Sequence, residues 1–241
     1  MRRLAAAVLA ILTLAVFGGL FRNTVEMTGA DMAVDVPAGW RVLTREDAKS
    51  ETSAAMFGMT SEDAVKMMED GDFFLILYEP KTGAEMYVTI FGSQYAAQLR
   101  SLSSLSEAEM DLAKEDVLQD YPGWEFDSAV TDKQLGDFTY LAATLHTGQG
   151  EERMDNRQLF TVYDGVEIYI DLYAKNSGLL ETHAAAQDAV AESLQVEYAM
   201  QKAAGLYNVY VAVLVGVLMM VLVQFVGLAL TLMVRIRERM G

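Results

Sequence analysis

The stretch QLFTVYDGVEIYIDLY, residues 158–173, carries the most regular sheet pattern in the chain. Its two apolar-rich segments, Gln158 to Tyr163 and Val166 to Tyr173, are joined by Asp164-Gly165, a dipeptide that favours the two-residue type I′ turn of a β-hairpin. From Val166 onward, apolar residues at even positions alternate with odd positions that include two acids. This alternation predicts a strand with one face packed against the core and the other face toward solvent.

The neighbouring sequence extends this hairpin into a four-stranded antiparallel meander. Two further segments with strand composition precede it, Trp124 to Val130 and Phe138 to Leu145. A sheet with one apolar face needs helices over that face. The segment Leu179 to Val196 is predicted to form such a helix, and its residues available for packing are Leu180, Val190 and Leu194.

The first half of the chain alternates shorter strand and helix signals. An alternating strand from Met32 is stopped by Pro37-Ala38-Gly39, and a helical region rich in alanine and charge follows from Thr44 to Gly58. A second short helix is predicted to begin after Thr60 or Ser61 as N-cap and to end at Gly71.

A hairpin and a capped helix complete this half. The segments Phe73 to Tyr78 and Glu85 to Phe91 have strand composition and flank a turn-like loop with proline and glycine. Ser106 and Glu109 have the spacing of a capping box, which predicts a helix ending at Pro122. The apolar face of this helix consists of Met110, Ala113, Val117, Leu118 and Tyr121.

The segment Val34-Asp35-Val36-Pro37-Ala38-Gly39-Trp40, together with this order of elements, resembles the PsbP-like superfamily. That group includes an extrinsic photosystem II subunit and bacterial envelope proteins of the DcrB type, and the resemblance covers roughly Met32 to Val196. It implies an α+β fold, an α/β/α sandwich around a mostly antiparallel sheet, used for binding and assembly rather than catalysis. Because the chain differs from the soluble members by its apolar C-terminal stretch, their partners and site residues are not transferred to it.

Both ends of the chain carry apolar runs. Leu206 to Val234 contains no Asp, Glu, Lys, Arg, His or Pro and is long enough to be predicted as a transmembrane helix. The run Leu4 to Phe21 follows a basic start and predicts either a signal anchor or a signal peptide. A poor cleavage site favours the uncleaved anchor. The fold class predicted for the whole chain is therefore an α/β/α sandwich plus transmembrane helices.

Basic residues next to these runs predict the topology, because lysine and arginine close to a membrane span stay on the cytoplasmic side. These residues are Arg2, Arg3, Arg235, Arg237 and Arg239. The resulting organisation is a signal anchor or signal peptide at 1–21, an extracytoplasmic domain at 22–205, a transmembrane helix at 206–234 and a short basic cytoplasmic tail at 235–241. Gln224 is predicted to contact another helix, because polar residues within a span seek partners.

Composition limits the partners and the chemistry. The chain has 34 acidic residues against 18 basic ones, a net charge of −16, which makes a nucleic-acid partner improbable on electrostatic grounds. There is no cysteine, so disulfides, thiolate metal sites and a cysteine nucleophile are excluded. The two histidines, His146 and His183, lack metal-ligand spacing, and the acidic clusters at 69–72 and 151–156 lack that of an EF-hand. We expect no catalytic, cofactor or metal residues.

The resulting functional prediction is a membrane-anchored extracytoplasmic binding or scaffold domain without catalysis, accessory to another envelope complex. The contact is expected through the exposed face of the sheet or through the C-terminal span, so the predicted partners are the lipid bilayer and another envelope membrane protein. Two alternatives stay open. One is a cell-surface hydrolase that uses paired carboxylates, and the other is a ligand sensor, which has only the residues from Arg235 onward to carry a signal inward.

Overall fold

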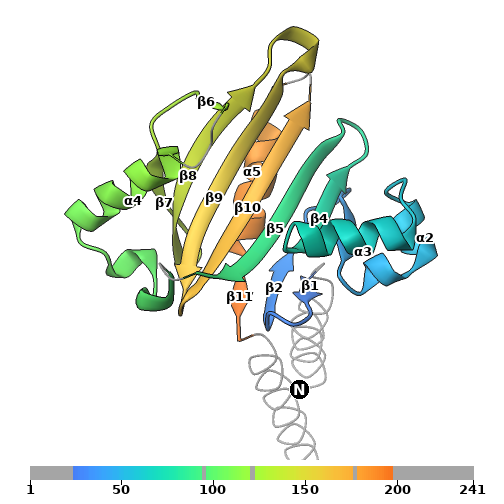
Figure 1. Ribbon diagram of the computed structural model, residues 1–241, viewed down its shortest axis with the longest axis horizontal. Helices are drawn as coiled ribbons and strands as arrows, with labels where there is room; N and C mark the ends of the chain where they lie inside the picture. Colours follow the sequence, from blue (N-terminus) through green and yellow to red (C-terminus); the bar gives the residue numbers. More distant parts are fainter. Residues whose placement is uncertain (1–23, 94–95, 120–122, 176–177, 198–241) are drawn as a thin grey trace, which may run out of the picture. The chain divides into compact units, whose positions relative to one another are not determined.

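The computed structural model describes residues 24–93, 96–119, 123–175 and 178–197. Eight strands form one antiparallel sheet in the order β3-β4-β5-β10-β9-β8-β6, with β7 also paired to β8 (Figure 1). The strands are β3 (Arg41–Thr44), β4 (Phe73–Glu79), β5 (Ala84–Gly92), β6 (Glu125–Phe126), β7 (Thr131–Leu135), β8 (Phe138–Thr147), β9 (Met154–Tyr163) and β10 (Val166–Lys175).

The hairpin of β9 and β10 lies near the centre of this sheet and forms as predicted. Tyr163 pairs with Val166, which leaves Asp164 and Gly165 as the two turn residues. Their φ angles are 44° and 87°, and a type I′ turn requires this positive φ at both positions. β10 also pairs along its length with β5, so these two strands are the middle of the sheet.

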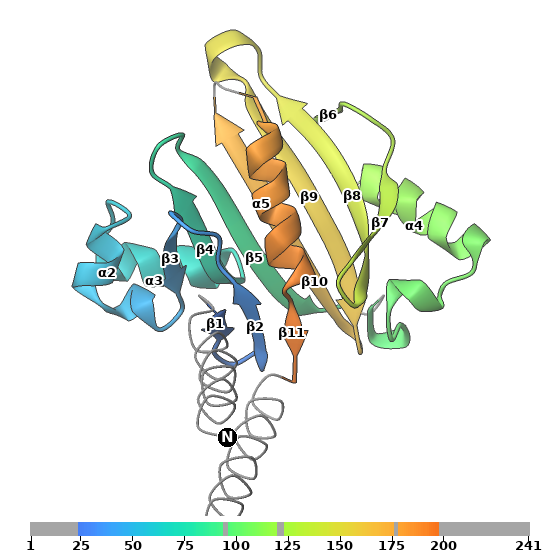
Figure 2. The same cartoon turned by 180° about the vertical axis from the view of Figure 1, so that it is seen from behind.

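One face of the sheet is covered by a helix and a small second sheet. The helix is α5 (Glu181–Glu192), and the small antiparallel sheet contains β1 (Thr24–Met27), β2 (Met32–Asp35) and β11 (Gln195–Val196). Three even-numbered residues in the middle of β10 point into this layer and are fully buried, as the alternation predicted: Ile168, Ile170 and Leu172. Figure 2 shows α5 lying along the strands on this side.

The opposite face is covered only at its two sides. The 3-10 helix η1 (Asp47–Lys49) and the helices α2 (Glu51–Ala55) and α3 (Ser61–Asp70) share a hydrophobic cluster with β3 and β4. The helix α4 (Glu107–Gln119), with the turns η2 (Ala96–Gln98) and η3 (Leu102–Ser104), packs over β8 and β9. A last 3-10 turn, η4 (Gly150–Glu152), lies in the loop between β8 and β9. Between the two groups, no helix of the described residues lies over β5 and β10 (Figure 1).

Local capping signals in the sequence are confirmed. The hydroxyl of Thr60 accepts a hydrogen bond from the backbone N–H of Asp63 at 3.1 Å, which makes Thr60 the N-cap of α3. The Ser106 hydroxyl accepts from the Glu109 N–H at 3.4 Å, while the Glu109 carboxylate accepts from the Ser106 N–H at 2.8 Å. These reciprocal bonds satisfy N–H groups that a helix start would otherwise leave unpaired.

Several predicted elements are wrong in extent or type. The helical region from Thr44 to Gly58 is broken into η1 and α2, and the residues just before it form the unpredicted strand β3. The predicted strand Trp124 to Val130 shortens to β6, and the polar segment that follows it becomes β7. The last helix ends at Glu192 rather than Val196, because the chain then joins the small sheet as β11. Leu180 is 43% exposed, whereas Val190 and Leu194 are buried.

The predicted fold class is also corrected. The described residues form a mostly antiparallel sheet with four α-helices, and the helices do not make two complete layers around it. None of the helices among these residues is long and apolar enough to cross a membrane, so the transmembrane helices of that prediction are not part of the observed fold. The segments for which spans were predicted, 1–21 and 206–234, lie outside the described residues.

Candidate functional site

The uncovered middle of the sheet is the candidate site. We call it the open strip and define it as the outward residues of β5 and β10: Glu85, Tyr87, Thr89, Phe91, Tyr169, Asp171 and Tyr173. Their even-numbered neighbours fill the core on the other side, so the period of two residues in a strand brings these side chains to one face. Phe91 is exposed, and the others are half-buried.

Aromatic rings cross the open strip in two rows. In the first row Phe73 contacts Tyr87 with ring centroids 4.7 Å apart, and Tyr87 meets Tyr173 edge-on at 5.7 Å. Trp124 extends this row, with its ring centroid 6.3 Å from that of Tyr173. The second row consists of Phe91 on β5, Tyr169 on β10 and Phe160 on β9. Such contacts fix the rings and leave flat apolar surface for a ligand.

The second row is held equally closely. The Phe91 and Tyr169 rings are stacked at an interplanar angle of 6°, with centroids 5.6 Å apart. Phe160 of β9 pairs with Tyr169 on the same face of the sheet, and their ring centroids are 4.7 Å apart. Because Phe160 is buried under the α4 side of the sheet while Phe91 is exposed, this row runs from the core to the surface.

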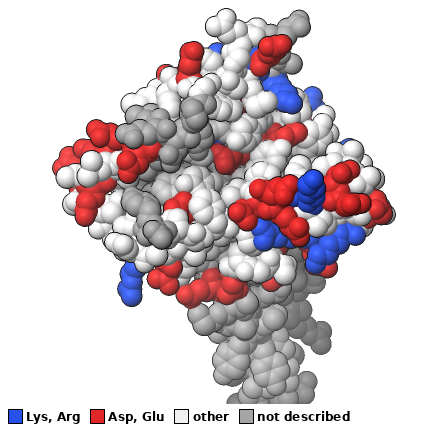
Figure 3. Space-filling model, in the orientation of Figure 1, with Lys and Arg blue, Asp and Glu red and all other residues white. Residues whose placement is uncertain are grey.

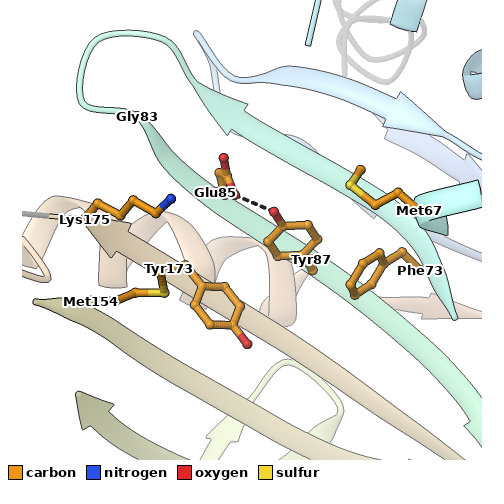
Figure 4. A pocket seen from close by; sticks show the side chains of 8 residues that line it. All are labelled: Met67, Phe73, Gly83, Glu85, Tyr87, Met154, Tyr173 and Lys175. Carbon is orange, nitrogen blue, oxygen red and sulfur yellow. Dashed lines mark hydrogen bonds between the residues drawn. The ribbon is translucent and has the colours of Figure 1, made fainter. Parts of the chain in front are cut away.

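A pocket of about 310 Å³ lies where the first aromatic row meets α3. Figure 4 shows the side chains that line it, including Tyr87 and Tyr173 on neighbouring strands and Met67 on α3. A second pocket of about 560 Å³ extends toward β3 and shares Met67, Glu85 and Tyr87 with the first. Both volumes fall in the range of about 300–1,000 Å³ that is typical of ligand pockets.

Acids and tyrosines are paired along the strip. The Tyr87 hydroxyl donates a hydrogen bond to Glu85 on the same strand, and the Tyr169 hydroxyl donates to Glu167 at 2.9 Å. Burial, followed by the nearby Glu85 carboxylate, raises the pKa of Tyr87 well above its ordinary value. Tyr87 is therefore a neutral hydrogen-bond donor at physiological pH.

Asp171 and Gln158 form the polar centre between the two rows. Asp171 lies opposite Tyr87 on one side and opposite Gln158 on the other. The Gln158 amide donates to the Asp171 carboxylate at 3.0 Å. Burial raises the pKa of Asp171 to about 6, against the opposing effect of hydrogen bonds from Gln158 and Asn156. Gln158 is 3% exposed, and its Oε1 has no hydrogen-bond partner among the described residues.

The charge distribution around the strip is uneven. Asp and Glu side chains gather over α4 and along α3, with mostly uncharged surface between them (Figure 3). Within the pocket of 310 Å³, the charged lining residues are Glu85 and Lys175. The ammonium group of Lys175 points toward Glu85 across the pocket (Figure 4). This pocket is thus close to neutral inside an acidic domain.

The histidines lie away from the strip. The Nδ1 atom of His146 is 2.8 Å from the Asp127 carboxylate at the β6 side of the sheet. His183 is a buried residue in the first turn of α5, and its Nε2 atom lies 3.0 Å from the Thr82 hydroxyl. Within the described residues no group of three or more His, Cys, Asp or Glu side chains is arranged to hold a metal ion.

The acidic clusters noted in the sequence are also placed. Residues 69–72 join the end of α3 to β4, as predicted. Residues 151–156 run from the loop between β8 and β9 into β9, where Asp155 and Asn156 are buried. The predicted topology residues and the predicted helix contact lie outside the described residues: Arg2, Arg3, Arg235, Arg237, Arg239 and Gln224.

Sequence reasoning identified the exposed face of the sheet but none of the residues of the site. Asp171 and Glu167 were predicted only as acids on a solvent-facing side of the strand, which is wrong for Glu167 because it is 6% exposed. The usable signal is a repeated acid-x-tyrosine pattern, which occurs as Glu85-Met86-Tyr87, Glu167-Ile168-Tyr169 and Asp171-Leu172-Tyr173. Spacing of two residues on a strand places each acid beside a tyrosine, which an alternation of apolar and polar residues alone does not indicate.

Comparisons with known proteins give distant structural similarities. No family model matches the chain, and no curated protein matches it. A protein from Bacteroides thetaiotaomicron VPI-5482 is similar in structure with a TM-score of 0.40 and 10% identity, over 68% of this chain and 44% of that one. LpqN of Mycobacterium tuberculosis, a protein involved in cell envelope biogenesis, is similar with a TM-score of 0.36 and 13% identity, over 68% of this chain and 82% of that one.

The chain thus spans less than half the length of the Bacteroides protein. Both similarities are too distant to assign a family or a function to this protein. The resemblance to the PsbP-like superfamily stays a prediction from the sequence.

Proposed function

We propose that this protein is a non-catalytic binding domain of the cell envelope, accessory to another envelope component, and that the open strip is its binding surface. The observation that carries this proposal is the uncovered pair of central strands. Burying the middle of a sheet is the ordinary outcome of folding, yet Tyr87 and Tyr173 are left half-buried beside a pocket. An aromatic floor with a few polar groups is typical of binding sites.

The location in the envelope rests on the sequence. The two ends of the chain carry five basic residues and one acid, whereas residues 22–205 carry 33 acidic residues against 13 basic ones. Such a distribution fits a domain exposed outside the cytoplasm. The absence of cysteine in the sequence provides a convenient test, because a single introduced thiol is the only one that can react.

The test compares the substitutions Phe91→Cys and Leu180→Cys. Phe91 is 37% exposed on the open strip, and Leu180 is 43% exposed at the start of α5 on the other side of the sheet. Both thiols should react with a membrane-impermeant maleimide in the purified protein. In intact cells Leu180→Cys should react as fast as before, whereas Phe91→Cys should react several-fold more slowly because the partner covers it.

Two results would contradict the proposal. Equal labelling rates of Phe91→Cys in cells and in the purified protein would show that nothing covers the strip. Failure of the impermeant reagent to label Leu180→Cys in intact cells would place the domain on the cytoplasmic side of the membrane, against the proposal.

A glycoside hydrolase is the second candidate, and one observation favours it. Glu85 and Asp171 lie on the same face at diagonal positions of neighbouring strands, because Glu85 pairs with Tyr173, two residues beyond Asp171. Diagonal positions are roughly 7–8 Å apart, and the two carboxyl groups of inverting glycosidases are separated by about 6.5–9.5 Å. A carboxyl with a pKa of about 6, such as that of Asp171, suits a general acid.

The present partners of these acids support binding over catalysis. Tyr87 donates to Glu85, and Gln158 donates to Asp171 at 3.0 Å, so each acid already accepts a hydrogen bond within the protein. The measurement is release of reducing sugar from neutral oligosaccharides. Release that disappears in both Asp171→Asn and Glu85→Gln, and persists in Asp116→Asn on the exposed surface of α4, would establish the hydrolase instead.

A further inference from the structure

The open strip and the two pockets beside it combine flat rings with hydrogen-bonding groups. Their acids, Glu85 and Asp171, are matched in number by the basic residues Lys175 and Arg41. Tyr87, Tyr173 and Phe91 present their rings on one face, and Thr89 and Asp171 lie between them. Tyrosine, threonine and aspartate side chains together supply both donors and acceptors. A suitable ligand therefore has apolar faces and a rim of groups that donate and accept hydrogen bonds.

Gln158 indicates where a hydrogen-bond donor of the ligand would lie. Gln158 pairs with Asp171 in register, so its side chain lies on the same face of the sheet, beside Asp171. It is 3% exposed, and its Nε2 group donates a hydrogen bond to the Asp171 carboxylate. Its Oε1 atom has no partner among the described residues, although buried polar atoms are nearly always hydrogen-bonded. A donor group on a ligand that reaches between the two aromatic rows would satisfy this acceptor.

The charges disfavour strongly ionic ligands. An anion would meet Glu85 and Asp171, in a domain that already carries many acids, at an unfavourable potential. A polycation would meet Lys175 at the first pocket and Arg41 at the second. A neutral ligand avoids both penalties, and the adjoining pockets of about 310 and 560 Å³ have room for more than one ring.

We propose that the open strip binds a neutral oligosaccharide segment of an envelope glycan. Sugar rings have apolar C–H faces that stack on aromatic side chains and a rim of hydroxyl groups that donate and accept hydrogen bonds. This inference rests on the proposed binding function and adds the class of ligand. In the proposed complex, the sugar rings stack on Tyr87 and Tyr173. Asp171 and Gln158 form hydrogen bonds with the hydroxyl groups of the sugar.

Trp124 provides an internal reporter of binding. It is one of two tryptophans in the chain, and its ring centroid lies 6.3 Å from that of Tyr173. The other, Trp40, packs against the core on the opposite face and near His183. In a Trp40→Phe background of the full chain, tryptophan fluorescence then reports the environment of the strip.

The experiment titrates this protein with a panel of neutral tri- and tetrasaccharides: α- and β-linked glucose, galactose and mannose oligomers and N-acetylglucosamine oligomers. We expect saturable binding to at least one of them. Tyr173→Ala and Phe91→Ala should each weaken it roughly three- to tenfold, as expected for loss of one aromatic contact. The control Leu180→Ala, on the other side of the sheet, should leave it unchanged.

Two further probes separate this inference from the proposed function. Decanoate represents an anionic amphiphile, and an alternating Lys-Leu peptide represents a basic one. Binding of either, lost in Tyr173→Ala while no sugar of the panel binds, would overturn the oligosaccharide inference and leave the strip as a binding surface. Sugar binding unaffected by both Tyr173→Ala and Phe91→Ala would also overturn it. Because Phe91 is exposed, its alanine variant is expected to fold even if the Tyr173 variant does not.

Discussion

At the scale of single residues, Asp171 is the most unusual group of the described chain. It is a carboxyl in the middle of a central strand, flanked by Tyr169 and Tyr173 on its own strand, by Tyr87 on β5 and by Gln158 on β9. Burial disfavours its charged form, so its pKa rises from 3.8 to about 6. The folded protein therefore holds a proton on Asp171 over a pH range in which the unfolded chain has released it.

This shift predicts a pH dependence of stability. Between about pH 4 and pH 6 the folded state binds more protons than the unfolded state, so the free energy of unfolding falls as pH rises through this window. Asp171→Asn removes the buried charge and keeps the shape. Urea unfolding should show this variant to be more stable than the parent by about 1–3 kcal/mol at pH 7.5, with the difference vanishing near pH 4.

The exposed residue Asp116 on α4 offers the matched control, because Asp116→Asn removes a charge without changing buried surroundings. It should shift stability by less than about 0.5 kcal/mol at either pH. A parent protein whose stability rises between pH 4 and pH 6 by the same amount as that of Asp171→Asn would contradict the assignment.

At the scale of elements, α5 is attached to the sheet by one buried polar side chain as well as by apolar packing. Gln187 is fully buried, and its Nε2 group donates to the carbonyl oxygens of Arg157 at 2.8 Å and Ile170 at 2.6 Å. Its Oε1 atom accepts from the Arg157 guanidinium at 2.6 Å. Arg157 also pairs with Asp188 at 2.9 Å, so the helix is fixed in register against β9 and β10.

Replacing this side chain tests how α5 is held. Gln187→Leu has similar size but removes the side-chain hydrogen bonds to the carbonyl oxygens of Arg157 and Ile170 and to the Arg157 guanidinium. We expect a loss of about 1–3 kcal/mol in the free energy of unfolding, measured by urea denaturation with an unchanged m value. Gln195→Leu in β11 is half-buried and serves as control. An equal loss in both variants would argue against a special role of Gln187.

The same scale shows where sequence patterns succeed. The β9–β10 hairpin, the caps at Thr60 and Ser106 and the β4–β5 hairpin depend on residues close to one another in the chain, so local patterns predicted them. The strands β3 and β7 were missed, because their residues become strands only through pairing with β4 and β8. The sequence of β7 is Thr-Asp-Lys-Gln-Leu, which has no alternation of apolar and polar residues that would predict a strand.

At the scale of the whole molecule, electrostatic repulsion acts on the fold. The chain carries a net charge of −16, and the acids of α3 and α4 are mostly exposed. A few surface pairs oppose this repulsion, such as Lys114 with Asp132 at 2.8 Å, but exposed pairs contribute only about 0–1 kcal/mol each. Repulsion therefore outweighs attraction among the surface charges at neutral pH.

Salt should then stabilise this protein. Raising NaCl from about 50 mM to about 500 mM shortens the screening length, so the melting temperature at pH 7.5 should rise, by about 2–4 °C for each kcal/mol of repulsion that is removed. Calorimetry or circular dichroism measures this. Near the isoelectric point of about 4.4 the effect should disappear. A melting temperature that falls with salt at pH 7.5 would show that the ion pairs dominate.

By itself the sequence determined the antiparallel hairpins, the capped helices, the acidic character and the absence of cysteine chemistry, because each of these depends on neighbouring residues or on composition. Only the tertiary structure decided that helices cover the two sides of the outward face and that no helix of the described residues lies over β5 and β10 there. That outcome depends on where α3, α4 and α5 pack, and their positions follow from contacts between distant segments such as Gln187 with Ile170. The site arises from residues of β4, β5, β9 and β10 that no local pattern could bring together.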